Sequence, residues 1–252
     1  MSVMRFRTVW LRNLMVWRKN VMATLVGNLG QPLLFLLAMG HGLGRTIAPI
    51  DGMDYAQFIA PGLTVSAVMY TAAFETTYGS YTRLSIQKTY EAILMTPLDM
   101  ADLVLGEVMW GATKGLLSGL IMLLALPIFG VIPSPWVAAL PPVLFLIGMF
   151  FAALGLIMTA LATNYDFFNY FISLVITPLF LFSGIFYPLS SLPEPYGELL
   201  AMLPLAPVVR VSRMLCLGHL DGHLILQLAG PALLTAASIW LAVVLLKHRL
   251  IR

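Results

Sequence analysis

The sequence has few charged residues. Asp, Glu, Lys and Arg make up 10% of its 252 residues, whereas hydrophobic residues make up 60%. A typical soluble domain carries about 25% charged residues. Because so few charges cannot cover a surface that faces water, lipid must be the solvent for most of the chain. The composition therefore excludes an ordinary soluble domain and predicts a single membrane domain, 1–252.

Several chemical signatures are missing as well. Cys216 is the only cysteine, so an internal disulfide is excluded. The phosphate-binding loop G-x-x-x-x-G-K-[ST] does not occur, so any ATP chemistry must be supplied by another chain. The net charge of +3 comes without a basic cluster on polar surface, which argues against nucleic acid as a partner. No catalytic triad, no pair of carboxylates beside a cleft and no metal box rises above chance, which disfavours an intramembrane enzyme.

One run near the end of the chain contains the residue types that bind metal ions, at a spacing that a metal site could have. It consists of Cys216, His219, Asp221 and His223. Gly218 and Gly222 make this run a flexible turn, so we expect a loop that enters the last hydrophobic segment and no metal site.

Six apolar runs are long enough to cross a bilayer, which takes about 20 residues in a helix. They lie at about 21–39, 58–80, 103–129, 136–162, 167–187 and 224–246. The first run follows five basic residues and is not closed by a small-x-small cleavage site, so it reads as a retained anchor. The sequence therefore predicts an all-α membrane protein with six transmembrane helices.

Basic residues set the orientation, because cytoplasmic segments carry the excess of Lys and Arg. With the N-terminus in the cytoplasm, the outer segments hold only Arg45, Arg210 and Arg213. The inner segments hold Arg5, Arg7, Arg12, Arg18, Lys19, Arg83, Lys88, Lys247, Arg249 and Arg252. Both termini are therefore predicted to be cytoplasmic. The excess of basic residues then reflects the orientation of the chain in the membrane.

Segment 4–19 has the pattern of an amphipathic helix. At 100° per residue, one arc holds Phe6, Trp10, Leu14 and Trp17, with basic residues beside and beyond it. Such a helix lies in the membrane interface with its basic face toward lipid headgroups. An ordinary basic flank of the first span is the alternative.

The inner segment between the second and third spans predicts a short helix over 84–96. Lys88 and Glu91 can pair at i,i+3, Pro97 ends the helix, and Asp99 can cap the next one with Asp102 in a capping box. Its apolar positions fall on one face: Ile86, Tyr90, Ile93 and Leu94. A partner protein, the bilayer or the chain's own helices could each cover that face.

The outer segment before the last span is too apolar for a free loop and too broken for a span. Prolines divide it into two helical pieces, about 194–203 and 208–217. Backbone of this kind survives at membrane depth only when it is buried in protein or lines a wet cavity. We expect a re-entrant hairpin over 190–217, with a folded loop as the alternative. Arg210 and Arg213 on it could contact substrate or anchor the helix at headgroup level.

The third span carries Gly111, Gly115 and Gly119, a ridge that permits close helix packing within this chain or with a second copy. Lys114 lies roughly 18 Å into the same span, at about 1.5 Å per residue. A charge at that depth needs a partner or water. Glu75 and Glu107 are the candidate partners. Lys114 is then either half of a structural ion pair or a group that contacts substrate or gates a path.

Four stretches carry a resemblance to a known family. They are WRKNVMATLVGNLGQPLLFLLAMGHGLG (17–44), YAQFIAPGL (55–63), FETTYGSYTRLSIQKTYEAILMTPLDMADLVLGE (74–107) and NYDFFNYFISLVITPLFLFSGIFYPLSSLP (164–193). With them the chain resembles the ABC-2 type permeases, and among these the nodulation protein J branch of lipo-oligosaccharide exporters. Segments 89–97 and 183–193 are the most specific, and the tail after about 219 adds nothing diagnostic.

The resemblance implies an exporter subunit of the bacterial inner membrane. Segment 84–96 would be the cytoplasmic coupling helix, seated in a cleft of a separate NodI-like ABC ATPase. Two permeases and two ATPases would assemble, with ATP and magnesium on the ATPase and no cofactor on this chain. The ATPase-coupling residues would be Lys88, Thr89, Tyr90, Glu91, Ile93, Leu94 and Pro97.

A transport path follows as a hypothesis. It would run along spans two and five at the interface of a permease homodimer, where aromatic faces suit sugar rings and acyl chains alike. The predicted path residues are Tyr70, Phe74, Glu75, Tyr78, Lys114, Phe180, Phe182, Phe186, Arg210 and Arg213. Lipid-facing or core packing is the alternative for each aromatic residue.

Other functions stay open at this point. The cargo could be a lipo-oligosaccharide or another amphipathic glycolipid, or the chain could export a hydrophobic drug or another lipid. A transporter driven by an ion gradient would use Glu75, Glu107, Lys114 and Asp166 as relay groups. A membrane scaffold without transport activity is a further possibility.

Overall fold

The computed structural model describes residues 5–19, 21, 30, 32–50, 52–131, 134–218, 222 and 224–250. Across these residues the structure is helical, and an isolated bridge between Ile50 and Met53 is its only β-type pairing. Four helices are long and apolar enough to cross a membrane: Tyr55–Ile86, Met100–Phe129, Pro135–Leu161 and Leu226–Leu250. They correspond to the second, third, fourth and sixth predicted spans.

The two other predicted spans are not confirmed. The first, 21–39, lies partly outside the described residues, and its end is the π-helix η1 (Leu36–Gly42), followed by η2 (Leu43–Arg45). The fifth, 167–187, is a shorter apolar helix that ends at Phe182. It consists of α7 (Phe167–Phe171), η7 (Ile172–Ile176) and α8 (Thr177–Phe182). Gly184 has a φ of +75°, so the chain turns away before the predicted end at 187.

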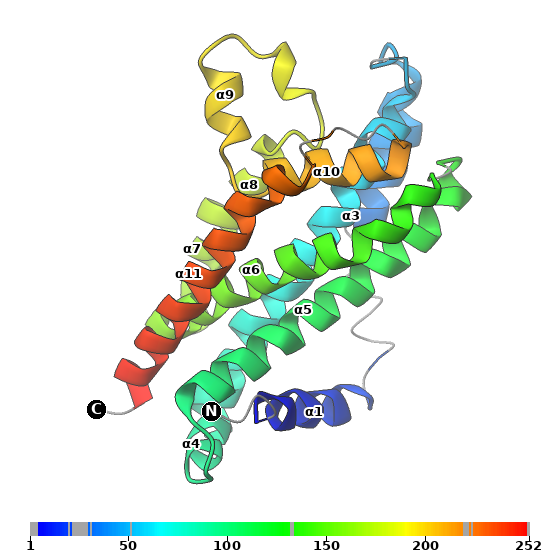
Figure 1. Cartoon of the computed structure of the whole chain (residues 1–252). Coiled ribbons are helices and arrows are strands. Elements are labelled where there is room, and N and C mark those ends of the chain that lie inside the picture. The colour runs from blue at the N-terminus through cyan, green and yellow to red at the C-terminus, as the bar shows by residue number, and fades with distance from the viewer. Residues whose placement is uncertain are drawn as a thin grey trace.

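Three long helices form the core. α3 (Tyr55–Phe74) continues through the π-helices η3 (Glu75–Gly79) and η4 (Thr82–Ile86), and it packs on both α5 (Met100–Ala125) and α6 (Leu140–Leu161). Short 3₁₀ turns, η5 (Leu126–Phe129) and η6 (Pro135–Ala139), flank the connection between α5 and α6. α11 (Leu224–Leu250) lies along α6 (Figure 1).

The glycine ridge of the third span packs within this chain. A Cβ at Gly111 would lie 2.8 Å from Ala152 Cβ on α6, and one at Gly119 would lie 2.7 Å from Val68 Cγ2 on α3. Real Cβ atoms do not come so close, so α5 needs glycine to approach both helices. The alternative, contact with a second copy, is not required for this ridge.

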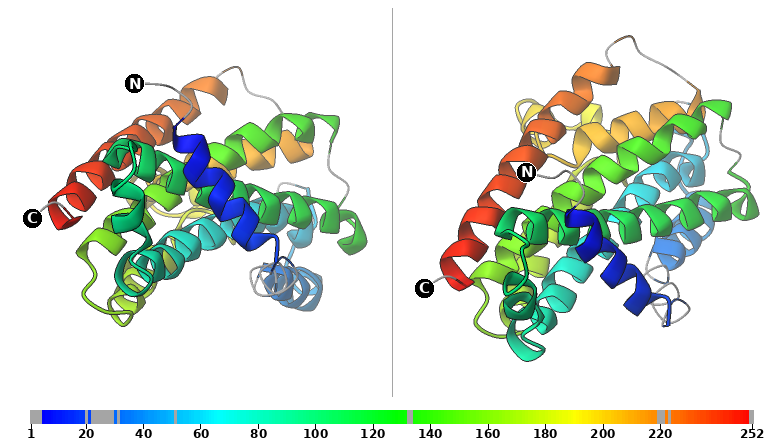
Figure 2. Two further views of the ribbon diagram at one scale, coloured as in Figure 1. Left: turned by 90° about the horizontal axis from the view of Figure 1, so that it is seen from below. Right: turned by 60° about the horizontal axis from the view of Figure 1, so that its bottom comes forward.

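Two short elements lie at one end of the bundle, called here the α1/α4 end. α1 (Phe6–Trp17) crosses the start of α5, as Figure 2 shows from below, and buries Val9 and Asn13. α4 (Thr89–Leu94) lies between η4 and the start of α5. At α5 the predicted capping box is present, with the Asp99 backbone N–H donating to Asp102 Oδ2 at 3.2 Å.

α4 differs from the predicted helix 84–96. The chain turns at Lys88, which has a φ of +54°, so the helix through Ile86 ends there and a separate helix begins at Thr89. The predicted single apolar face is therefore split. Ile86 is 64% exposed, whereas Tyr90 is fully buried. The predicted pair is present, with Lys88 Nζ 3.0 Å from Glu91 Oε1.

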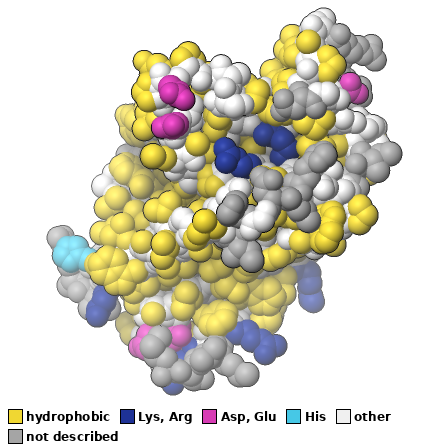
Figure 3. All heavy atoms as spheres, turned by 45° about the horizontal axis from the view of Figure 1, so that its top comes forward, with side chains coloured by type: hydrophobic (Ala, Val, Ile, Leu, Met, Phe, Trp, Pro, Cys, Tyr) yellow, Lys and Arg dark blue, Asp and Glu magenta, His cyan; other side chains and the backbone are white. Residues whose placement is uncertain are grey.

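The opposite end, called the α9/α10 end, carries η8 (Leu189–Ser191), α9 (Tyr196–Ala201) and α10 (Ala206–Leu217). These helices match the two predicted pieces of the hairpin. α10 lies across α3 and α11 with Val208, Val211 and Leu215 buried, whereas α9 leaves Tyr196 and Leu199 63% exposed. Figure 3 shows basic side chains in a hollow at this end, bordered by hydrophobic ones.

Candidate functional site

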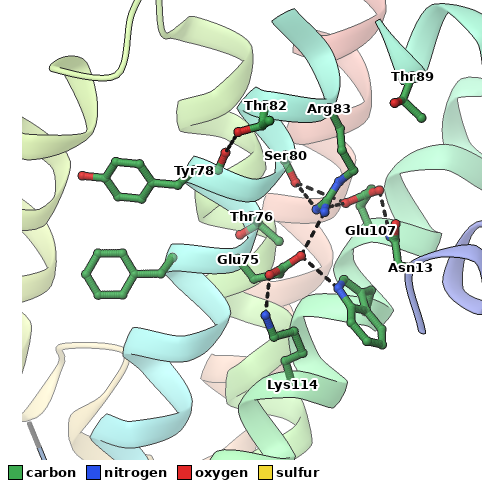
Figure 4. Close-up of polar contacts among 12 residues, drawn as sticks. Asn13, Glu75, Thr76, Tyr78, Ser80, Thr82, Arg83, Thr89, Glu107 and Lys114 are labelled. Atoms are coloured by element: carbon green, nitrogen blue, oxygen red, sulfur yellow. Dashed lines mark hydrogen bonds and ion pairs between the residues drawn. The ribbon is translucent and has the colours of Figure 1, made fainter. Parts of the chain in front are cut away.

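A cluster of charged side chains lies inside the α1/α4 end. At its centre is Glu75, which accepts hydrogen bonds from three residues (Figure 4). Lys114 Nζ lies 2.6 Å from Glu75 Oε2, Arg83 Nη1 lies 3.0 Å from Oε1, and Trp110 Nε1 lies 2.9 Å from Oε1. The structure thus pairs the deep lysine with Glu75, one of its two predicted partners.

The second predicted partner, Glu107, belongs to the same cluster through Arg83. Arg83 Nη2 lies 2.7 Å from Glu107 Oε2, and Ser80 Oγ donates to the same oxygen at 3.2 Å. Asn13 Nδ2 on α1 donates to Glu107 Oε1 at 2.9 Å. Arg83 therefore bridges both carboxylates, and the cluster joins α1, the continuation of α3, and α5.

Local backbone features bring these side chains together. The π-helix η3 begins at Glu75, and π-turns inside α-helices are frequent at functional sites. Gly79 leaves space for the ion pair, since a Cβ there would lie 3.2 Å from Glu75 Oε1. Gly106 likewise leaves space for α1 to pack on α5, because a Cβ there would lie 2.5 Å from Val9 Cβ.

The charges in the cluster balance. Two carboxylates face two cations, and the side chains of Glu107 and Lys114 are 1% and 9% exposed. Ions so far from water need partners, and removing one partner of a buried pair is strongly destabilising. The cluster therefore fixes the relative positions of the helices that contribute to it.

α4 is attached to this cluster by Tyr90. The Tyr90 side chain is fully buried, and its pKa is raised well above the ordinary value by burial and by the nearby Glu107 carboxylate. The phenol therefore stays neutral. The other side of α4 is open, with Lys88 and Glu91 side chains 62% and 50% exposed and Met95 88% exposed. Among the described residues, one face of α4 is thus held by the charge cluster while the opposite face is exposed.

Most aromatic residues of the predicted path form a connected row. Tyr70, Phe74 and Tyr78 follow each other at i,i+4 on α3 and η3, with ring centroids 6.1 and 5.8 Å apart. Phe180 contacts Tyr70 at 5.6 Å and Phe186 at 5.0 Å. We call these five residues the aromatic row.

Two further residues extend the aromatic row past Tyr78. Tyr165 stacks on it with centroids 6.2 Å apart and planes 8° apart, and Phe168 contacts it edge-on at 5.2 Å. Phe182, also predicted for the path, is 46% exposed on α8.

The two arginines of α10 have different surroundings. Arg213 Nε donates to the Phe58 carbonyl at 3.2 Å, Nη2 donates to the Gly184 carbonyl at 2.9 Å, and the guanidinium lies 3.8 Å above the Phe58 ring. These contacts favour the anchoring alternative for Arg213. Arg210 is exposed and lines a cavity of about 360 Å³ together with Glu194 and Glu198.

A metal site finds no support in the described part of the chain, where no group of three or more His, Cys, Asp or Glu is placed to hold an ion. Cys216 is a buried free thiol. His219, Asp221 and His223 lie outside the described residues.

Sequence reasoning missed four members of the charge cluster: Asn13, Ser80, Arg83 and Trp110. Arg83 was assigned to the basic excess of the inner face, because a lone arginine at the end of a span has that pattern. Its spacing of eight residues from Glu75 is the one available signal, because in an ordinary α-helix this spacing places two residues about 80° apart, on one broad face.

The chain is similar to known membrane proteins along most of its length. The sequence model of the family described as ABC-2 type transporter matches residues 4–217. Nodulation protein J of Sinorhizobium fredii is 37% identical over 96% of this chain and 93% of its own length, and that of Rhizobium meliloti is 36% identical over 96% and 92%. The inner membrane transport permease YadH of Escherichia coli is 28% identical over 87% and 85%. This chain therefore belongs to the ABC-2 type transporter family as one of its membrane-spanning permeases.

Proposed function

We propose that this permease is the membrane subunit of an ATP-driven exporter and that α4 is the element on which a separate ABC ATPase acts. Two permeases and two NodI-like ATPases would form the complex in the bacterial inner membrane, with the α1/α4 end in the cytoplasm. ATP and magnesium would bind to the ATPase. The permease would supply the path for the cargo and the surface that receives the movement.

The attachment of α4 is the observation that carries this proposal. A partner that moved α4 through its open face, at Glu91 and Met95, would also move Tyr90. Tyr90 lies against Arg83 and Glu107, which hold α1, η4 and α5 together. A displacement at the surface therefore has a direct route into the long helices. Transport follows only if the ATP-bound and ATP-free partners contact α4 differently.

The proposed cargo is an amphipathic glycolipid such as a lipo-oligosaccharide. The partly exposed rings of the aromatic row, Phe74, Tyr78 and Phe186, support this class, because ring faces bind sugar rings and acyl chains alike. Tyr70 and Phe180 are buried, which favours core packing for these two. Two of the relatives described above are nodulation protein J, and a third is an inner membrane transport permease. Export of another lipid or a hydrophobic drug through the same row is the second candidate.

Transport driven by an ion gradient receives less support. A relay carboxylate must gain and lose a proton or ion, yet Glu75 and Glu107 are each held by a cation and by further donors. Asp166, the remaining candidate, is exposed in a turn before α7. These three carboxylates therefore do not form a path of ionisable groups across the bundle.

Charge reversal on α4 tests the proposal. Glu91→Arg places a second cation beside Lys88 on the open face and leaves Tyr90 in place. We expect the variant to insert and fold normally but to lose most co-purification with its ATPase, and to lose ATP turnover stimulated by glycolipid. The assay uses the permease co-expressed with each ABC ATPase of the same bacterium that lacks a membrane domain.

The matched control is Glu198→Arg, the same reversal at an exposed position on α9, at the opposite end of the molecule. This control should retain both the complex and its stimulated turnover. If Glu91→Arg supports ATP-dependent export as well as Glu198→Arg does, α4 is not the contact. Export by the purified permease alone, driven by a proton or sodium gradient, would overturn the proposed function altogether.

A further inference from the structure

A cavity of about 430 Å³ opens beside the charge cluster. Its walls come from α1, from the continuation of α3, and from α5. Holding a single water takes only about 10–15 Å³ of such space, so this cavity has room for a polar group of many atoms. It lies at the α1/α4 end, which also carries the basic residues of α1.

The walls of this cavity are rich in positive charge. Arg12, Arg83 and Lys114 line it, against the single carboxylate of Glu75. Glu107 lies behind Arg83 and balances one of these cations, which still leaves the walls positive. Arg12 is the least committed of the three, since its contact in the structure is Nη1 to Asn13 Oδ1 at 3.3 Å.

One of the lining residues also holds a buried hydrogen-bond donor without an acceptor. Trp17 Nε1 is inaccessible and has no hydrogen-bond partner among the described residues, whereas the Arg83 guanidinium lies against the Tyr90 hydroxyl. Buried N–H groups in folded proteins are nearly always paired, so an unpaired one calls for a ligand or a water. Because the indole N–H only donates, the missing partner must be an acceptor.

Together these observations define the chemistry of a ligand. A cation is disfavoured, because Glu75 is already committed to Lys114 and Arg83. An apolar group would leave the Trp17 donor unpaired. An anion with several acceptor oxygens satisfies this donor and the positive walls at once, and the guanidinium fork of Arg12 fits phosphate especially well. Burial lowers the pKa of the Arg12 guanidinium, and a bound anion would offset that cost.

We infer that this cavity is a binding site for a phosphate-type anion, held by Arg12 and by the unpaired Nε1 of Trp17. The anion is either the headgroup of an acidic lipid or a soluble phosphate compound. The inference does not depend on the ATPase contact proposed above, because binding is a property of the permease alone.

The test measures binding by the purified permease in dodecyl maltoside, a detergent without phosphate. Tryptophan fluorescence reports on the site, because Trp17 and Trp110 line it. One arm titrates dihexanoyl phosphatidylglycerol and the other titrates inorganic pyrophosphate, with dioctanoylglycerol as the phosphate-free lipid. We expect a saturable change in at least one arm and none with dioctanoylglycerol, and the responding arm identifies the source of the anion.

Two variants of α1 make the test specific. Arg12→Gln removes a lining cation and should weaken binding about tenfold. Arg7→Gln removes the same charge from an exposed position of the same helix that does not line the cavity, and should leave binding unchanged. The inference is overturned if neither probe gives a saturable change, or if both variants weaken binding equally, which would indicate attraction to surface charge alone.

Discussion

At the scale of single residues, Arg83 decides how the α1/α4 end is held. It spans two carboxylates from different helices, whereas Lys114 contacts one of them. Burying these ions costs their solvation free energy. The attraction between them offsets that cost only while all partners are present. The four charges should therefore respond unequally to substitution.

The unequal response can be measured with Glu75 and Lys114. Glu75→Gln leaves Lys114 without a carboxylate and should cost roughly 3–5 kcal/mol, the usual penalty for breaking a buried pair. Lys114→Met leaves Glu75 with Arg83 and Trp110, so it should fold and cost clearly less. Unfolding by SDS titration of the purified protein gives both values. The double variant should recover part of the loss. Strictly additive losses would show that Glu75 and Lys114 do not interact.

The sequence narrowed the partner of Lys114 to Glu75 or Glu107 without distinguishing them. Depth and opposite charge were readable, but the choice depends on the widened turns that begin at Glu75. Such turns leave no clear trace in residue type. Arg83 and Glu107 are 24 residues apart on different helices, so their contact is a product of tertiary packing alone.

At the scale of elements, α1 is a part of the bundle in its own right. Its amphipathic pattern predicted a surface helix, and the structure adds a polar face that binds α5. Trp10 Nε1 donates to Thr113 Oγ1 at 3.0 Å, and Asn13 reaches Glu107. The close approach depends on Gly106, where the two backbones leave no room for a side chain.

Gly106→Ala should therefore push α1 off α5. The new Cβ would lie 2.5 Å from Val9 Cβ and 2.8 Å from the Phe6 carbonyl oxygen, and overpacking of this kind typically costs about 1–3 kcal/mol. Trypsin cleavage at Arg12 measures the release of α1 and should become about tenfold faster, as roughly 1.4 kcal/mol would give. Gly230→Ala, where no atom lies within 4 Å, is the control. Equal cleavage rates in the two variants would show that α1 does not depend on this contact.

Hydropathy located the elements well where a helix is long and apolar, which accounts for the four predicted spans that coincide with helices long enough to cross a membrane. It placed the hairpin pieces because prolines mark their limits. It failed at α4, where the left-handed turn falls on a lysine, a residue with no particular preference for that conformation. Pattern alone therefore continued the helix across Lys88 and joined Ile86 to Tyr90.

At the scale of the whole molecule, positive charge is gathered at one end. Basic residues lie on α1, at Lys88 just before α4 and in the last turn of α11, all at the α1/α4 end, whose elements Figures 1 and 2 show. At the other end, α10 carries Arg210 and Arg213. Lys- and Arg-rich short segments stay in the cytoplasm during insertion. The distribution therefore predicts α4 inside and α9 outside.

Reporter insertions test this orientation directly. Alkaline phosphatase, which is active only outside the cytoplasm, should be inactive when inserted after the exposed Met95 and active when inserted after the exposed Glu194. A fluorescent protein fused to the C-terminus should fold and emit in the cytoplasm. Because Arg249 donates to the carbonyls of Thr159 and Ala162 at the end of α6, α6 and α11 must end on the same side. Phosphatase activity at Met95 would reverse the orientation and remove α4 from the reach of any cytoplasmic ATPase.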